Sequence, residues 1–145
     1  MSSTPLLPVV YSFGANGATD VRVLSVASGH GYSDVASAAT STPTITLTTG
    51  TSVIISISAN IKDTTNTATT GFMSFIVSGA SSIAASDANS ISAGLLSVSG
   101  EVGSMSRTFK LTSLTSGLNT FTAVYKAVGG TSVSFSNRDI VVFPL

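Results

Sequence analysis

Residues 118–145 read LNTFTAVYKAVGGTSVSFSNRDIVVFPL, and this stretch alternates between apolar and polar side chains. In Leu118–Lys126 the aromatic side chains of Phe121 and Tyr125 share one face, while hydroxyl and charged side chains occupy the other. A strand places successive side chains on opposite faces, so a period of two indicates a sheet with one face in the core and one in water. This segment therefore predicts a half-buried strand.

The alternation resumes after two glycines. Gly129-Gly130 can supply the positive φ angles of a tight turn, and Thr131–Asn137 then directs Val133 and Phe135 to one side. We therefore predict a tight hairpin, followed by a last strand that starts at Arg138-Asp139 with a local ion pair on the surface and ends at the C-terminus.

Several strand and turn segments occur here in a fixed order: Thr115–Thr122, Tyr125-Lys126, Gly129–Thr131 and Ser136–Val142, with the earlier Gly71–Gly79 in a matching register. Together they resemble the closing strands of small jelly-roll domains found on tailed-phage virions. The resemblance covers residues 52–145 and leaves the first fifty or so residues outside. It implies a trimeric capsid decoration protein or a fibre head.

Further strands are predicted along the rest of the chain. The stronger candidates are Val21–Val26, Thr44–Thr48, Ser52–Ile61, Phe72–Val77 and Ser104–Leu111, and the weaker ones are Ser81–Ala85 and Gly94–Val98. The nearly continuous apolar run Phe72–Val77 predicts a central strand buried on both faces. In Ser104–Leu111 the inward residues should be Met105, Phe109 and Leu111, and a short helical turn is expected at Asp87–Asn89.

The expected architecture is all-β, because no segment shows sustained helical periodicity. We predict a single antiparallel β-sandwich, jelly-roll-like, over residues 20–145, preceded by an extended N-terminal arm over residues 1–19. Pro5, Pro8, Gly14 and Gly17 interrupt the arm, so it is not expected to form a packed helix or strand.

The arm is apolar. On hydrophobicity alone, its predicted partner-binding residues are Leu6, Leu7, Val9, Val10 and Phe13. Two alternatives stay open for them: they contact a partner surface, or the arm folds back onto its own domain.

The polarity of the chain comes from hydroxyl groups. It has 27 serines and 20 threonines, whereas charged residues make up 8% and cancel to a net charge of zero. Without a basic stripe to meet phosphates, nucleic acid is not an expected partner. A mean hydropathy of +0.50 with no net charge is unusual for a free monomer and favours a homo-oligomer. The alternative is that Ala and Val raise the mean without forming apolar patches.

The chain has no cysteine, which excludes disulfides, thiolate catalysis and cysteine-ligated zinc. The first twenty residues lack Lys and Arg, and no apolar run approaches the roughly twenty residues that cross a bilayer. Neither a signal peptide nor a membrane anchor is expected. No Asn-x-Ser/Thr sequon occurs either, which disfavours a glycosylated surface protein.

Candidates for chemistry are few. His30 lies between glycines, and a triad with Asp34 and a serine lacks the Gly-x-Ser-x-Gly elbow. Asp63 with Asn66, or Asp87 with Asn89, are better explained as turn caps than as calcium ligands. We therefore predict no catalytic residue, no metal and no cofactor, and hence no enzyme.

Two functions are compatible with these features. The first is a homotrimeric decoration, or cement, protein that binds the major capsid protein on the exterior of the virion and stabilises the shell. The second is a fibre or tail-tip head that binds a receptor or carbohydrate. Sugar platforms favour Trp and Tyr, and this chain has no Trp and only three Tyr, which favours the decoration protein.

Overall fold

The computed structural model describes residues 10–13, 22–25, 32, 42–63, 68–95, 100–129 and 132–145. The secondary structure of these residues consists of strands and one short 3-10 helix. In chain order they are β1 (Val10–Phe13), β2 (Arg22–Ser25), β3 (Thr44–Thr49), β4 (Val53–Asp63), β5 (Thr69–Gly79), η1 (Asp87–Asn89), β6 (Ile91–Leu95), β7 (Val102–Leu111), β8 (Gly117–Gly129) and β9 (Ser132–Pro144). The helical turn predicted at Asp87–Asn89 is confirmed as η1.

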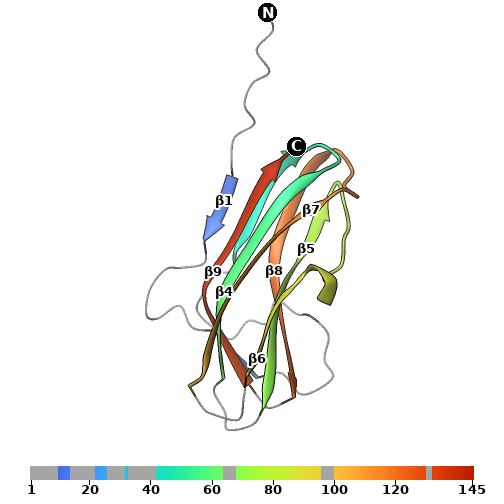
Figure 1. Cartoon of the computed structure of the whole chain (residues 1–145). Helices are drawn as coiled ribbons and strands as arrows, with labels where there is room; N and C mark the ends of the chain where they lie inside the picture. Colours follow the sequence, from blue (N-terminus) through green and yellow to red (C-terminus); the bar gives the residue numbers. More distant parts are fainter. Residues whose placement is uncertain are drawn as a thin grey trace, which may run out of the picture.

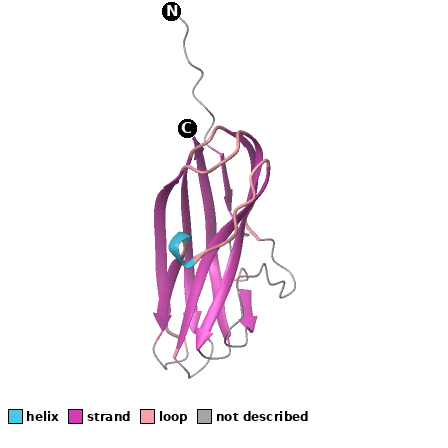
Figure 2. Ribbon diagram, turned by 90° about the vertical axis from the view of Figure 1, so that its right-hand side faces the viewer, coloured by secondary structure: helices cyan, strands magenta, loops and turns pink. Residues whose placement is uncertain are grey.

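The strands form two antiparallel sheets that pack face to face (Figures 1 and 2). Sheet A has the order β1-β9-β4-β7, with β2 also paired to β9, and sheet B has the order β3-β8-β5-β6. The all-β antiparallel sandwich predicted from the sequence is therefore confirmed.

The pairing pattern is that of a jelly roll. β1 and β2 lie end to end along β9, opposite its C-terminal and N-terminal halves, so they act as one strand position. That first position pairs with the last strand, β3 pairs with β8, β4 with β7, and β5 with β6. One long antiparallel hairpin rolled up so that its halves pack together gives this arrangement, the double Greek key of jelly-roll domains.

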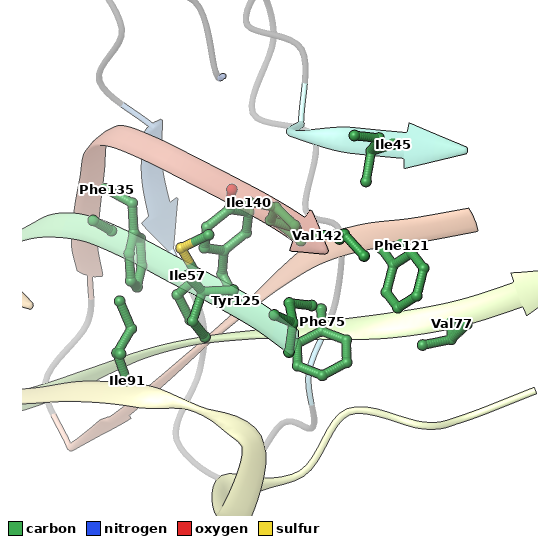
Figure 3. Close-up of a cluster of buried hydrophobic side chains, with 14 of the residues drawn as sticks. Ile45, Ile57, Phe75, Val77, Ile91, Phe121, Tyr125, Phe135, Ile140 and Val142 are labelled. Atoms are coloured by element: carbon green, nitrogen blue, oxygen red, sulfur yellow. The ribbon is translucent and has the colours of Figure 1, made fainter. Parts of the chain in front are cut away.

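The core lies between the sheets and follows the period-two pattern. In β4 every second residue from Val53 to Ile61 is buried, and in β8 the same holds from Phe121 to Ala127. Figure 3 shows these buried side chains, among them Tyr125 of sheet B and Phe135 of sheet A, whose ring centres are 4.9 Å apart.

Sheet B approaches sheet A closely at Gly71 of β5. A Cβ atom there would lie 2.5 Å from Cγ2 of Ile61 and 2.8 Å from Cγ1 of Val133. No side chain fits without moving these core residues, so the glycine sets the spacing between the layers.

A β-bulge divides β9. Ser58 of β4 faces Asp139 and Asn60 faces Ser136, so two residues of β9 oppose one of β4. Asn137 occupies the left-handed region, with φ of 48°. The extra residue reverses the alternation, because Val133 and Phe135 point inward before the bulge, and Arg138, Ile140 and Val142 point inward after it.

Because of the bulge, the predicted surface position of Arg138 is wrong. Arg138 was expected in an ion pair on the surface, but its side chain is fully buried. Its Nη1 donates a hydrogen bond to Oη of Tyr125 at 3.1 Å, and its guanidinium carbon lies 5.7 Å from the centre of that ring. Arg138 thus belongs to the core, where its polar end meets the hydroxyl of β8.

The prediction of a tight hairpin after β8 is wrong. Gly129 does adopt a positive φ of 97°, but β8 belongs to sheet B and β9 to sheet A, so the two strands are not paired. Gly129 is the last residue of β8, and the chain passes from sheet B to sheet A between β8 and β9. A turn signal shows that the chain reverses direction, but it does not show which sheet receives the next strand.

Other boundaries also differ from the predictions. Ser81–Ala85 contributes only an isolated bridge between Ile83 and Val77, and the strand expected at Gly94–Val98 is instead β6, which starts at Ile91. β5 is central in sheet B as predicted, but Phe72 on its outer face is only half-buried.

The edge strand β7 departs from its prediction at one residue. Phe109 and Leu111 pack against the core as predicted, whereas Met105 is 37% exposed. An edge strand has a neighbour on one side only, so an inward-facing side chain there can remain open to solvent.

A buried amide ties loops together at the upper end of the sandwich, the end where the C-terminus lies (Figure 1). Asn119 is fully buried; its Oδ1 accepts from the Ser81 amide at 2.7 Å, and its Nδ2 donates to Oγ1 of Thr49 at 2.8 Å and to the Thr115 carbonyl at 3.0 Å. Because each polar atom is satisfied, this amide fixes the ends of three segments at little cost.

Candidate interaction surface

The structure describes two of the five predicted partner-binding residues. Val10 and Phe13 lie in β1, where they pair with Val142 and Asp139 of β9, while Leu6, Leu7 and Val9 lie outside the described residues. The arm was not expected to form a strand, but residues 10–13 do, because the outer edge of β9 offers backbone groups that need hydrogen-bond partners. For these four residues the backbone folds back onto its own domain. Partner binding by the arm stays a prediction.

The acidic residues of the described ranges do not gather. Within those ranges, no group of three or more His, Cys, Asp or Glu is arranged to hold a metal ion. Asp63 was expected in a polar loop, but it ends β4 and is fully buried, and its backbone exchanges hydrogen bonds with Glu101 and Gly100 at 3.0 Å each. Its proposed calcium partner Asn66, and His30 with Asp34, lie outside the described residues.

One charged cluster lies on the outer face of sheet B. We call Tyr32, Phe72, Asp87 and Lys126 the lysine–aromatic cluster. The Lys126 ammonium forms an ion pair with Asp87 and lies 4.7 Å from the ring centre of Tyr32 and 4.4 Å from that of Phe72. Oη of Tyr32 donates to the same Asp87 carboxylate at 2.8 Å. A cation held against two ring faces gains from their negative quadrupole.

The cluster shifts two pKa values in opposite directions. Burial of the phenol, with the hydrogen bond and negative charge of Asp87, raises the pKa of Tyr32 well above its ordinary value, although a hydrogen bond with Ser90 acts the other way. The hydrogen bonds from Lys126 and then Tyr32 lower the pKa of Asp87. At neutral pH the cluster therefore holds Tyr32 as a neutral phenol and Asp87 as a carboxylate. Its polar groups bond to one another, so the cluster is better suited to a structural role than to catalysis.

Residues 80–90, which connect β5 to β6, cover part of the outer face of sheet B, and we call them the roof segment. Ser74 of β5 points outward yet is fully buried, because its Oγ donates to the carbonyls of Ser86 at 3.2 Å and Asn89 at 2.8 Å. From sheet A, Nη1 of Arg107 donates to the carbonyls of Ala88 at 2.8 Å and Ser90 at 3.2 Å. The roof segment is thus fastened to both sheets.

The outer face of sheet A is different, and we call it the open face. Its side chains come from the outward positions of β4, β7 and β9, and are mostly hydroxyl or amide groups: Ser56, Ser58, Asn60, Ser104, Ser106 and Thr108. Three cross-strand hydrogen bonds order them, from Thr108 to Ser56 at 2.9 Å, from Ser104 to Asn60 at 2.7 Å and from Ser58 to Asp139 at 3.2 Å.

A depression interrupts the open face beside the bulge of β9. Its volume is about 240 Å³, and its lining contains no charged or aromatic residue: Ser58, Ala59, Asn60, Ser104, Met105, Ser106 and Asn137. Hydroxyl and amide groups of this kind suit a neutral polar ligand. Without an aromatic platform, the depression lacks the stacking surface that sugar sites usually have.

The upper end of the open face is apolar. Ile54 of β4 lies directly opposite Phe143 of β9, and Val141 is two residues before Phe143 on the same side. Leu145 continues the alternation and is 53% exposed, whereas the other three are half-buried. We call these four residues the apolar corner. Sequence reasoning missed it, because its members come from strands whose neighbours only the topology reveals.

Comparison with protein-family models finds no match to this chain, and a search of curated proteins finds no relative. Among the described residues, no helix is long and apolar enough to cross a membrane. The fold and the surfaces described above are therefore the features of the chain that bear on its function.

Proposed function

We propose that the chain is a virion structural protein: a homotrimeric capsid decoration protein that binds the major capsid protein on the outside of the shell and stabilises it. In this role the chain makes contacts and carries out no reaction. Viral capsid proteins are among the recurrent users of the jelly roll, but a fold hosts many functions, so the proposal needs support from a surface.

The open face is the observation that carries the proposal. It is a sheet surface whose central charge, Asp139, already accepts a hydrogen bond from Ser58, and its two lysines, Lys62 and Lys110, lie towards its opposite ends. Interface cores are depleted of charge and have a polar rim. The pattern of hydroxyl groups, an apolar corner and peripheral lysines fits such a surface.

The proposed mechanism is repeated weak contact. A trimer presents three copies of the same face and arm to a threefold or quasi-threefold position of a shell. Once one copy binds, the others bind at a high effective concentration, so the set binds far more tightly than each contact alone. Bridging neighbouring capsid subunits in this way resists outward pressure.

Quantitative mass spectrometry of purified particles tests the proposal. We expect about one copy, or a simple fraction such as about one third, per copy of the major shell protein, as a coat on symmetric positions requires. A handful of copies per particle would indicate a fibre or tail tip instead. Absence from the particles would overturn the virion role.

The depression beside the bulge favours a second candidate, a receptor- or carbohydrate-binding head. Titration of the purified chain with neutral oligosaccharides, followed by NMR, would test it. Shifts confined to the amides of Asn60, Ser104 and Asn137, and lost in Ser104→Asp, would support the head. No shift at millimolar sugar would exclude this site as a sugar site.

A further inference from the structure

The apolar corner is an unusual feature of an otherwise hydroxyl-covered face. Ile54 and Phe143 form a cross-strand pair, Val141 extends the pair along β9, and Leu145 is more than half exposed beside them. Aromatic and aliphatic side chains clustered at one place on a surface gain free energy when a partner covers them.

The N-terminal arm joins the sandwich at this same end. β1 runs antiparallel to β9, with Val10 opposite Val142 and Phe13 opposite Asp139. Tracing the chain backward from Phe13 to Val10 therefore leads toward Phe143 and Leu145. Val10 therefore lies beside the apolar corner, and the uncharged, apolar segment Leu6–Val9 directly precedes it in the sequence.

The prolines of the arm argue against a sharp return onto the same copy. Thr4 and Leu7 each precede a proline, and a residue before proline is biased toward extended conformations. An extended chain advances about 3.3 Å per residue, so Leu6 would reach about 13 Å beyond Val10 along the direction of β1. Ile54 lies two strands across the sheet, about 10 Å to the side of that direction. An arm that continues β1 thus leads away from its own corner.

We propose that the Leu6–Val9 segment of one copy docks on the apolar corner of a second copy. The contact is between neutral apolar groups, with Lys110, opposite Ile54 in β7, at its margin. Exchange of an end segment between identical subunits needs no new complementary surface, because every copy carries both the segment and its site. The inference rests on the self-association in the proposed function and names the surfaces that make it; it does not depend on a virion.

Engineered cysteines provide the test, since the chain has none of its own. Full-length Leu7→Cys carrying a size tag is co-expressed with untagged Ile54→Cys and mildly oxidised. We expect a disulfide-linked species of one tagged and one untagged chain on a non-reducing gel. The matched control pairs tagged Leu7→Cys with Ser104→Cys, an exposed position further down the open face, and should give no such species.

The alternatives give distinct results. The double variant with both cysteines in one chain, oxidised at high dilution, would form a disulfide within a monomer if the arm covers its own corner, and that would overturn the proposal. Absence of any disulfide with both Ile54→Cys and Val141→Cys, in variants with the circular dichroism spectrum of the parent chain, would also overturn it. Because purified protein suffices, either failure is separate from the stoichiometry of virus particles.

Discussion

The outer faces of the two sheets differ although they enclose one core. On sheet B, Val124 and Ser74 occupy outward positions, yet Val124 is 3% exposed and Ser74 is fully buried. On sheet A, the outward residues Ser106 and Thr108 of β7 are exposed. The roof segment, which contains η1 (Figure 2), and the lysine–aromatic cluster cover these positions of sheet B, whereas the outward residues of β7 in sheet A have no such cover. A strand pattern defines which residues point outward, but only a covering segment determines whether they meet water.

The largest expected effect comes from a charge placed under this cover. Val124→Asp should lower the free energy of unfolding by about 3 kcal/mol or more, because it buries a carboxylate without a partner. The matched change on the open face, Ser106→Asp, should stay within about 0.5 kcal/mol. Urea denaturation with an unchanged m value measures both. Equal losses for the two variants would mean that the faces do not differ in burial.

The sequence was sufficient for the fold class, because apolar residues recur at every second position of β4 from Val53 to Ile61 and of β8 from Phe121 to Ala127, and both sides of the core follow from that pattern. It was insufficient where one residue changes the register. The bulge at Asn137 shifts β9 by one position and turns Arg138 inward, and local alternation carries no sign of this shift. The crossover after Gly129 was misread for a similar reason, since its direction depends on contacts far along the chain.

The candidate surfaces were less predictable than the fold. The sequence identified the arm as apolar, but the apolar corner unites Ile54 with residues near the C-terminus, and the lysine–aromatic cluster unites Tyr32 with Lys126. Such sites depend on strand order, which periodicity does not encode. Asn119 is two residues before Phe121 and so shares the inward face of β8, but the sequence does not reveal the hydrogen-bond partners that satisfy its buried amide.

The next effect concerns the attachment of the roof segment. Ser74→Ala removes the donor to the carbonyls of Ser86 and Asn89 and should cost about 1–2 kcal/mol, since both acceptors lose a partner under the cover. Ser58→Ala, which removes a donor to Asp139 on the open face, should cost less than about 0.5 kcal/mol because water replaces it. Thermal and urea unfolding of the two variants measures these costs. A larger loss of stability in Ser58→Ala than in Ser74→Ala would contradict the contrast between the two faces.

Acid should weaken the lysine–aromatic cluster on sheet B. The pKa of Asp87 is lower in the folded chain than in the unfolded chain, chiefly because of Lys126, so its contribution to stability is present above the unfolded pKa of about 4 and is lost as the pH falls through the folded value. The stability gap between the parent chain and Asp87→Asn should therefore be constant above about pH 4 and close as the pH falls below it. A gap that is constant with pH, measured by urea midpoints, would show that the ion pair contributes nothing.

Alkali should weaken the same lysine–aromatic cluster by ionising Tyr32. Burial raises the pKa of its phenol in the folded chain, so the stabilising contribution is complete below the unfolded pKa of about 10 and is lost as the pH rises toward the folded value. The parent chain should lose stability relative to Tyr32→Phe above about pH 10. Ultraviolet titration of the parent chain against Tyr32→Phe should show that the Tyr32 phenol ionises late. Ionisation of all three phenols at the ordinary pH would contradict the burial of Tyr32.

The smallest expected effect tests whether the stability cost of a substitution depends on the exposure of the residue or on the sheet in which it lies. Thr108 bonds Ser56 on the open face at 2.9 Å, and Thr46 bonds Thr120 at 2.8 Å on an exposed part of sheet B beyond the roof segment. Thr108→Val and Thr46→Val should each change the free energy of unfolding by about 0.5 kcal/mol or less, because valine suits a strand and water satisfies the remaining hydroxyl. If cover determines the cost, the two variants agree although they lie on different sheets. If Thr46→Val instead costs as much as Ser74→Ala, the whole outer face of sheet B behaves as a buried layer, and the contrast lies between the sheets and not between covered and open positions.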